Sequence, residues 1–267
     1  MPTGAFGWNS QLMLFTMNYV ATAEGFLGGL GRVFVARDLL EMTSLEDGIE
    51  KITRSNMGAG HNYQLFDLKN QNIRNVEVST NALYSVRAIQ SGQPAFFHAN
   101  QYETLNISQI YSNSSLHRLA RAKVLLADRP IETPADMIHV IGDQGDVSWP
   151  IYHDNLSHQK GELSDWTLCT LFVDPIETRL EIYLNNPRSN KPVLTVNLTD
   201  HFGTLKNEGS ENKSYRPVVI MHGMNNNEKG YEKNIEAIQA QYPGIYMARS
   251  FLHRHPHATL ITLNPGT

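Results

Sequence analysis

The sequence predicts an α+β protein in which antiparallel sheets form the core and helices interrupt the order of the strands. Three observations predict this class. Apolar and polar residues alternate through three neighbouring segments, residues 62–68, 73–79 and 83–89. Apolar residues recur at helical spacing through residues 115–128, and alternation returns in residues 166–184. The chain has 267 residues, of which 41% are hydrophobic and 18% charged, so it can bury a sizeable core.

The first third of the chain predicts a strand, two amphipathic segments and then the three alternating segments. Residues 11–20, QLMLFTMNYV, predict a buried strand, and a glycine-rich turn follows. An amphipathic run covers residues 33–42. Ser44-Leu-Glu-Asp47 has the pattern of a helix start, and the apolar residues after it share one helical face (Leu45, Ile49 and Ile52). Asn and Ser residues separate the alternating segments, so an antiparallel meander is the simplest interpretation.

Helices are predicted in the middle of the chain and strands after them. One helix covers residues 115–128, and a second begins after the cap Thr133 and Pro134 and runs to about Ile141. The segments TLCTLFVD and RLEIYL then predict a β-hairpin, and VLTVNL predicts another strand.

A polar stretch divides the chain into two expected units. Residues 199–214 are rich in Gly, Asn, Glu and Lys, which is typical of a linker. They separate a larger domain, residues 1–198, from a tail, residues 215–267, in which PVVIMHGM predicts a short buried strand followed by a turn.

Charge and cysteine content argue against several kinds of function. The net charge is −4 and no run is rich in Lys or Arg, so nucleic acid is not an expected partner. No stretch reaches the roughly 18 apolar residues that a membrane span needs. The single thiol, Cys169, lies in an alternating segment, where a buried structural cysteine is expected. Pro256 interrupts a group of three histidines, and we interpret that group as an exposed polar tail (His253, His255 and His257). We therefore expect no metal and no cofactor.

Two features of the sequence favour different compartments. The opening segment lacks the basic start and the apolar run of a signal peptide, which predicts a cytoplasmic protein. Five Asn-X-Ser/Thr sequons favour the secretory route, although asparagine-rich sequence also produces such triplets by chance (Asn106, Asn113, Asn155, Asn197 and Asn212). A lysosomal or secreted protein is expected if an upstream signal peptide is missing.

Five blocks of sequence, in this order, resemble the acyl-coenzyme A:6-aminopenicillanic acid acyltransferase family. The blocks are GRVFVARDLLEMTSLEDGIEKI, GAGHNYQLFDLKNQNIRNVEVS, FFHANQYE, HRLARAKVLLADRPIETPADMIHVIGDQG and TLCTLFVDPIETRLEIYLNNP. The resemblance covers residues 5–187, and the order of the blocks carries more weight than any single block. Proteins of this family are N-terminal nucleophile (Ntn) hydrolases, which cut or exchange amide bonds. The resemblance implies a four-layer αββα sandwich, in which two antiparallel sheets pack face to face with helices outside.

The same resemblance implies which residues carry the chemistry. The nucleophile of the family is a cysteine that self-cleavage exposes as a new N-terminus, and its α-amine serves as the base. That cysteine is expected upstream of Met1, so the sandwich is expected to be incomplete at its N-terminus and the chain inactive as it stands.

In the block FFHAN, Asn100 resembles an oxyanion donor, since a neutral amide stabilises negative charge without repelling a thiolate. The alternative is an asparagine that caps the turn after a strand AFFHA. His98 either shapes the site or is a packed core histidine, and Asn18 falls where the family usually has an asparagine that we interpret as structural.

The tail resembles the beginning of a palmitoyl-protein thioesterase, on the segment RPVVIMHGMNNN and the later YEKNIEAIQAQYPGIY. That family is an α/β-hydrolase that uses Ser, Asp and His, and the resemblance implies that the backbone N–H of Met224 helps to hold the oxyanion. No Gly-X-Ser-X-Gly occurs in the 267 residues, so the tail is expected to be a truncated fragment that is too short to be stable alone. The alternative is a plain apolar edge strand followed by a turn.

Three functions from different classes follow from these residues. The first is an amide (C–N bond) hydrolase or acyltransferase of the N-terminal cysteine type, with a small acyl amide as substrate. The second is a thioester hydrolase like the palmitoyl-protein thioesterases. The third is a binding protein that keeps the Ntn fold without its chemistry. We expect the first for the encoded family, and no signature in the sequence specifies the acyl group or an oligomeric state.

Overall fold

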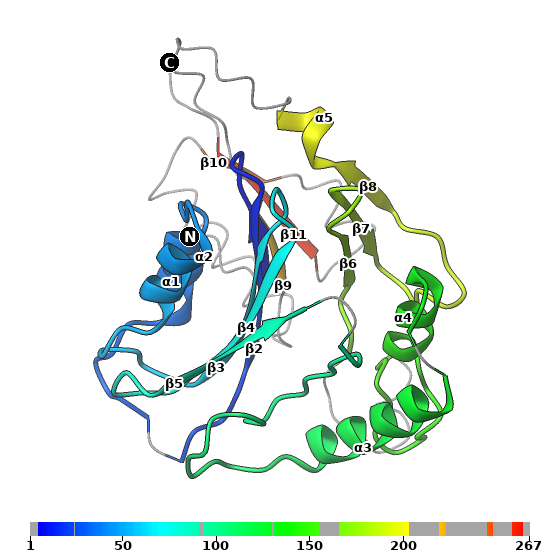
Figure 1. Ribbon diagram of the computed structural model, residues 1–267, viewed down its shortest axis with the longest axis horizontal. Coiled ribbons are helices and arrows are strands. Elements are labelled where there is room, and N and C mark those ends of the chain that lie inside the picture. The colour runs from blue at the N-terminus through cyan, green and yellow to red at the C-terminus, as the bar shows by residue number, and fades with distance from the viewer. Residues whose placement is uncertain are drawn as a thin grey trace.

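The computed structural model shows an antiparallel sheet with helices on one side of it and a second, smaller sheet on the other (Figure 1). The structure describes residues 5–23, 25–90, 93–129, 131–154 and 166–202, together with the backbone of three strands later in the chain.

The larger sheet has five antiparallel strands that follow one another in chain order. They are β1 Phe6–Trp8, β2 Met13–Tyr19, β3 His61–Asp67, β4 Asn72–Val78 and β5 Tyr84–Ile89. The predicted strand over residues 11–20 and the predicted meander are therefore confirmed. In the register of the sheet Asn18 lies opposite Asn62, and Asn62 lies opposite Glu77. Because side chains alternate between the two faces of a sheet, these three residues share one face.

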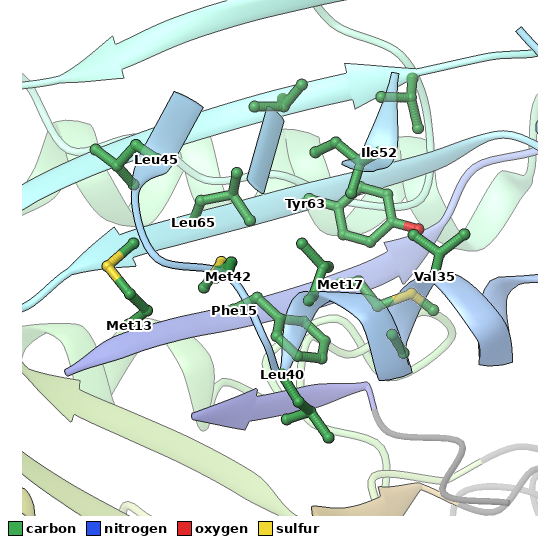
Figure 2. Packing of buried hydrophobic residues seen from close by; sticks show 14 of the residues in the cluster. Met13, Phe15, Met17, Val35, Leu40, Met42, Leu45, Ile52, Tyr63 and Leu65 are labelled. Atoms are coloured by element: carbon green, nitrogen blue, oxygen red, sulfur yellow. The ribbon is translucent and has the colours of Figure 1, made fainter. Parts of the chain in front are cut away.

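The opposite face of this sheet is apolar and is covered by two helices, α1 Arg32–Leu39 and α2 Leu45–Ile52. Figure 2 shows the side chains of this core, in which residues of β2 and β3 pack against the two helices and the turn between them (Met13, Phe15, Met17, Tyr63 and Leu65 against Val35, Leu40, Met42, Leu45 and Ile52). The oxygen of the Ser44 side chain accepts a hydrogen bond from the backbone N–H of Asp47 at 3.1 Å, so the predicted helix start is confirmed.

A second antiparallel sheet packs on the other face of the first. Its strands are β6 Thr170–Asp174, β7 Arg179–Tyr183 and β8 Leu194–Asn197, in the order β6-β7-β8. This confirms the predicted hairpin and the strand after it. A shared apolar cluster joins the two sheets, with Trp8, Leu14 and Leu68 from one side meeting Leu180 and Leu198 from the other. Packing of the two sheets face to face excludes water from the apolar space between them.

Two further helices pack on each other near one end of the small sheet. They are α3 Asn113–Asp128 and α4 Pro134–Ile141, and both were predicted from the sequence. A capping box formed by Thr133 and Asp136 begins α4. In Figure 1 the pair lies below β6, and its small core includes Phe97 from the preceding loop.

The structure differs from the prediction at the start of the expected linker. Residues 198–202 form a short helix, α5 Leu198–Phe202, where the linker was expected to start. The carbonyl of Thr178 accepts from the N–H of Leu198, so this first turn is anchored to the small sheet. The later strands are β9 Val219–His222, β10 Ile245–Met247 and β11 Ala258–Leu263. They form an antiparallel sheet in the order β10-β11-β9, and β9 confirms the strand predicted from PVVIMHGM.

Candidate active site

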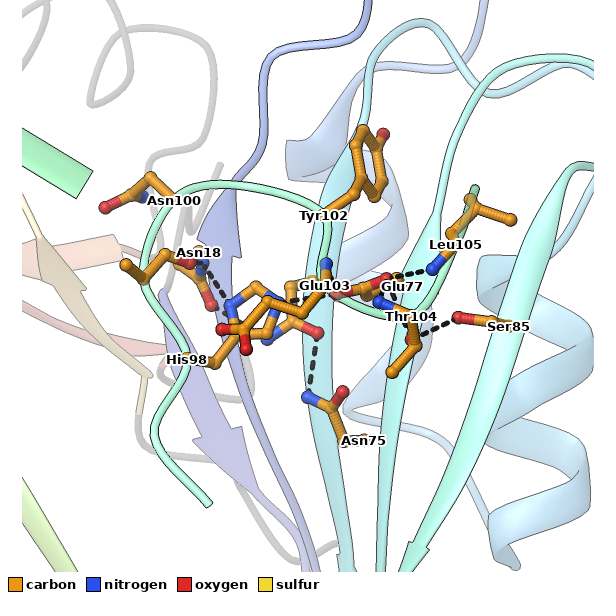
Figure 3. A network of polar contacts seen from close by, with 12 residues as sticks. Asn18, Asn75, Glu77, Ser85, His98, Asn100, Tyr102, Glu103, Thr104 and Leu105 are labelled. Atoms are coloured by element: carbon orange, nitrogen blue, oxygen red, sulfur yellow. Dashed lines mark hydrogen bonds and ion pairs between the residues drawn. The ribbon is translucent and has the colours of Figure 1, made fainter. Parts of the chain in front are cut away.

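One end of the inner face of the large sheet is polar, and this is where the sequence-predicted residues meet. The face that meets the small sheet carries Leu14 and Phe66 toward one end. Toward its other end the same face carries Asn18, Asn62 and Glu77. A loop through residues 98–105 crosses this polar end (Figure 3). The predicted strand AFFHA is wrong, because residues 94–99 form no strand. The segment is attached to the sheet through side chains instead of through a ladder of backbone hydrogen bonds.

Three asparagine side chains form a continuous chain of hydrogen bonds across three strands. The amide nitrogen of Asn75 donates to Asn62 Oδ1 at 2.7 Å, and Asn62 Nδ2 donates to Asn18 Oδ1 at 3.1 Å. Asn18 Nδ2 then donates to the carbonyl of Ala99 at 2.8 Å. A carbonyl can only accept, so this last bond fixes the orientation of every amide in the chain. The prediction that Asn18 is structural agrees with these contacts, which attach the loop to β2.

His98 lies between the chain of amides and a buried carboxylate. Its Nε2 is 2.8 Å from Glu77 Oε1, and its Nδ1 is 3.4 Å from the amide nitrogen of Asn18. An ionised carboxylate only accepts and the Asn18 amide nitrogen only donates, so these partners assign the ring hydrogen to Nε2. The side chain of His98 is 3% exposed. His98 is thus a packed histidine with two specific polar partners.

Glu77 accepts several hydrogen bonds that the loop donates. Its two carboxylate oxygens accept from the backbone N–H groups of Glu103 at 2.6 Å, Thr104 at 2.9 Å and Leu105 at 2.6 Å, and from the Thr104 hydroxyl at 2.8 Å. Burial alone would raise the pKa of Glu77, but the hydrogen bonds from His98 and from these backbone groups outweigh it and lower the pKa to about 2. Glu77 is thus a permanent anion that holds the loop over the sheet.

Asn100 sits at the end of β2 with its amide held from both sides. Its Nδ2 donates to the carbonyl of Tyr19 at 2.8 Å, and its Oδ1 accepts from Nη2 of Arg118 at 2.8 Å. An amide nitrogen carries two hydrogens, and the hydrogen bonds to described residues engage one of them. The remaining N–H is a neutral donor in a fixed orientation, which is what stabilisation of a developing oxyanion requires.

The single thiol does not belong to this site. Cys169 packs at the border of the apolar cluster between the two sheets. Burial raises its pKa to about 11, so that only about one thiol in 10⁴ is ionised at neutral pH. The interpretation of Cys169 as a structural residue is supported by this environment.

Several residues of the site were missed by sequence reasoning. Glu77, Asn62 and Asn75 are polar members of the alternating segments and Arg118 is a polar residue of the predicted helix, and none of them is assigned to a site by the sequence alone. Asn75 and Glu77 stand at alternate positions of NIRNVEVS and therefore share one face, but only the structure shows that this face is buried. Met224 lies outside the described residues, so the structure places it neither in this site nor away from it.

Neither a metal centre nor a membrane helix is found in the part of the chain that the structure describes. Its His, Cys, Asp and Glu side chains form no group of three or more that could hold a metal ion. None of its helices combines the length and the apolar character that crossing a bilayer requires.

Two antiparallel sheets in contact, with helices on the outer side of the larger one, are consistent with the class of Ntn-like hydrolases and acyltransferases. The chain belongs to the acyl-coenzyme A:6-aminopenicillanic acid acyltransferase family, whose model matches residues 1–189 of the 267. The resemblance noted over residues 5–187 is therefore confirmed. No curated protein matches the chain.

Proposed function

We propose that this protein is an amide (C–N bond) hydrolase or acyltransferase of the N-terminal cysteine type, in which Asn100 donates a hydrogen bond to the oxyanion. A small acyl amide or related acyl donor is the expected substrate, in keeping with membership of an acyltransferase family. His98 shapes the site in this proposal, because it connects the loop that carries Asn100 to the anion of Glu77.

The observation that carries the proposal is the fixed amide of Asn100. Its oxygen is engaged by Arg118, a donor, and its nitrogen by the carbonyl of Tyr19, an acceptor. The amide therefore cannot rotate by half a turn without placing like groups against each other. A donor that needs no reorganisation during the reaction stabilises a tetrahedral oxyanion most effectively.

The attacking thiolate is the part of this chemistry that residues 1–267 do not supply in a suitable form. Cys169 is their single thiol and has a raised pKa of about 11. We therefore propose that the 267-residue polypeptide forms no acyl-enzyme by itself, and that turnover needs a form of the protein with a cysteine at a processed N-terminus near β1.

The test compares the 267-residue protein with a longer form that carries such a cysteine. Each is incubated with acyl-coenzyme A and with N-acyl p-nitroanilides, and the acyl adduct is sought by intact mass spectrometry. The longer form should gain the mass of one acyl group and release p-nitroaniline. Asn100→Ala should then lower kcat by roughly 10²-fold to 10³-fold, as loss of one oxyanion donor does.

Asn106→Ala provides the matched control, since Asn106 is exposed directly after the same loop and its loss should leave kcat unchanged. An Asn100→Ala variant that keeps full kcat would rule out the oxyanion role. Absence of adduct from both forms, with cooperative unfolding retained, would instead favour a binding protein that keeps the fold without the chemistry.

The finer architecture is part of the same proposal. We propose that α1 and α2 form one outer layer, that α3 and α4 belong to the other, and that the domain expected over residues 1–198 folds as one unit. The anchored turn of α5 supports a boundary after residue 202 in place of 198. Limited proteolysis tests this boundary, because the first cuts should fall beyond residue 202.

A thioesterase activity of the tail is the less favoured candidate. The strand β9 at Val219–His222 supports it, with Met224 as the proposed N–H donor after that strand. However, β9 pairs antiparallel with β11, whereas a strand, helix, strand unit of an α/β-hydrolase builds parallel pairs. Hydrolysis of palmitoyl-coenzyme A by the 267-residue protein would support this candidate.

A further inference from the structure

Arg118 on α3 is the arginine that contacts the Asn100 amide, and its surroundings are unusual for a cation. Its Nε donates to Ser114 Oγ at 3.1 Å, and its Nη2 donates to Asn100 Oδ1 at 2.8 Å and to Ser115 Oγ at 3.3 Å. Both serines are buried. Burial lowers the pKa of Arg118, and none of the ion pairs found within the described ranges involves it.

Among the described residues this partly buried guanidinium has no carboxylate partner, so its charge acts on the neutral groups that it contacts. A hydrogen bond from a charged donor is shorter and roughly twice as strong as one between neutral groups, and low local polarity strengthens it further. Here the neutral acceptor is the oxygen of the Asn100 amide. Withdrawal of electron density through that oxygen increases the positive character of the N–H groups on the other side of the amide.

We propose that Arg118 is a positioning residue, which fixes the orientation of the Asn100 amide and strengthens its remaining N–H as a donor to the oxyanion. This inference rests on the proposed function for its catalytic meaning. Its geometric content, that the guanidinium holds the amide, can be tested without turnover.

The neighbouring Arg121 shows what an ordinary structural arginine does on the same helix. Its Nε and Nη2 reach the two oxygens of Asp143 at 2.7 Å and 3.0 Å, and the hydrogen bonds to Asp143 raise the pKa of Arg121. Asp143 also accepts from Arg188 at 2.9 Å, so it keeps one cation when Arg121 is replaced. Arg121→Met is therefore the matched control for Arg118→Met.

The first test measures the side-chain amide of Asn100 by NMR in ¹⁵N-labelled 267-residue protein, with the signal assigned by its loss in Asn100→Ser. In Arg118→Met, hydrogen exchange of this amide should accelerate by about tenfold, since a charge-assisted bond is lost. Arg118→Lys should restore part of the protection, because a point charge cannot reproduce the planar fork. Arg121→Met should leave the Asn100 signal unchanged.

An Asn100 amide that keeps its shift and exchange rate in Arg118→Met would overturn the inference. Should Arg118→Met fail to fold, Arg118→Gln keeps a donor of similar shape without charge, and the same comparison is made with it. In any form that turns over, Arg118→Met should lower kcat by about tenfold with KM little changed, as expected for a group that acts on the transition state. Lack of turnover in the parent would count against the proposed function and would leave the NMR comparison valid.

Discussion

Glu77 is a buried carboxylate whose charge is balanced by hydrogen bonds in place of a cation. Its side chain is 0% exposed, and five donors surround its two oxygens. An isolated buried charge would be costly, but backbone N–H groups and the His98 ring compensate for the lost hydration. The loop that carries Asn100 is thus tied to the sheet by a group that stays ionised over the whole physiological range.

The ionisation of Glu77 predicts a pH dependence of stability. Its pKa of about 2 in the folded protein lies below the ordinary value of 4.5. The depressed pKa stabilises the folded state above about pH 4.5, and this contribution is lost as the pH falls from 4.5 toward 2. The contribution at pH 7 is on the order of 3 kcal/mol. Urea unfolding should therefore show Glu77→Gln far less stable than the parent at pH 7, with a smaller difference near pH 3.

Glu50→Gln is the control for this prediction, because Glu50 is exposed on α2. Other buried carboxylates, including Asp143, titrate in both proteins and cancel in the difference. A Glu77→Gln variant whose deficit stays constant between pH 7 and pH 3 would show that the loop is held by other contacts.

At the scale of elements, the hairpin between β4 and β5 contains a backbone conformation that its sequence does not favour. Asn81 and Ala82 have φ angles of 59° and 56°, and the N–H of Leu83 bonds to the carbonyl of Thr80 at 3.3 Å. Two successive positive φ angles are typical of the type I′ turn, which suits the twist of a hairpin. Asparagine tolerates this region, but an alanine there is strained because of its Cβ.

Ala82→Gly should consequently stabilise the protein by roughly 0.5–1 kcal/mol, as relief of the left-handed strain exceeds the extra entropy of glycine in the unfolded chain. The measurement is the shift in the midpoint of thermal unfolding. Ala88→Gly, in the middle of β5, should destabilise the protein by a similar amount. If both substitutions lower the midpoint, the turn does not hold Ala82 in the conformation described.

At the scale of the whole molecule, two separate apolar cores share the large sheet. One lies between the sheet and α1 and α2, and the other lies between the two sheets. The second core occupies the apolar part of the inner face and leaves the polar part to the site. Packing against the small sheet therefore excludes water from one part of this face, while the loop of residues 98–105 covers another part.

Leu180 offers a test of this coupling, because it is 1% exposed and belongs to the core between the sheets. Leu180→Ala should cost about 3 kcal/mol through lost burial and a cavity. If the sheets fold as one unit, urea unfolding stays a single transition with a lower midpoint. Leu194→Ala, on the exposed side of β8, should cost less than about 1 kcal/mol. A second transition in Leu180→Ala alone would mean that the small sheet folds independently.

Much of the fold could be predicted from the sequence because its signals are local. Alternation identified the meander and the hairpin, and capping residues located the starts of α2 and α4. The segment AFFHA was the exception: its apolar residues resemble a strand, but long-range contacts of His98 and Ala99 decide its path. Local patterns cannot reveal such partners, which lie about 80 residues away for Asn18.

The site was predictable in part for the same reason. His98 and Asn100 carried a motif, whereas Glu77 and Arg118 become recognisable only once the layers place them beside that motif. A charged residue in an alternating strand is usually solvated, and no local feature of NIRNVEVS says that a loop will cover Glu77.

The asparagine chain across β4, β3 and β2 also acts as a check on alignment. A shift of β3 by a single position would carry Asn62 to the helix-covered side and bring His61 or Tyr63 between Asn18 and Asn75. A sheet whose strands pair in the wrong register would thus lose these hydrogen bonds at the place where the reaction is proposed to occur. Insertions in the turns flanking β3 should be tolerated only when they leave this alignment intact.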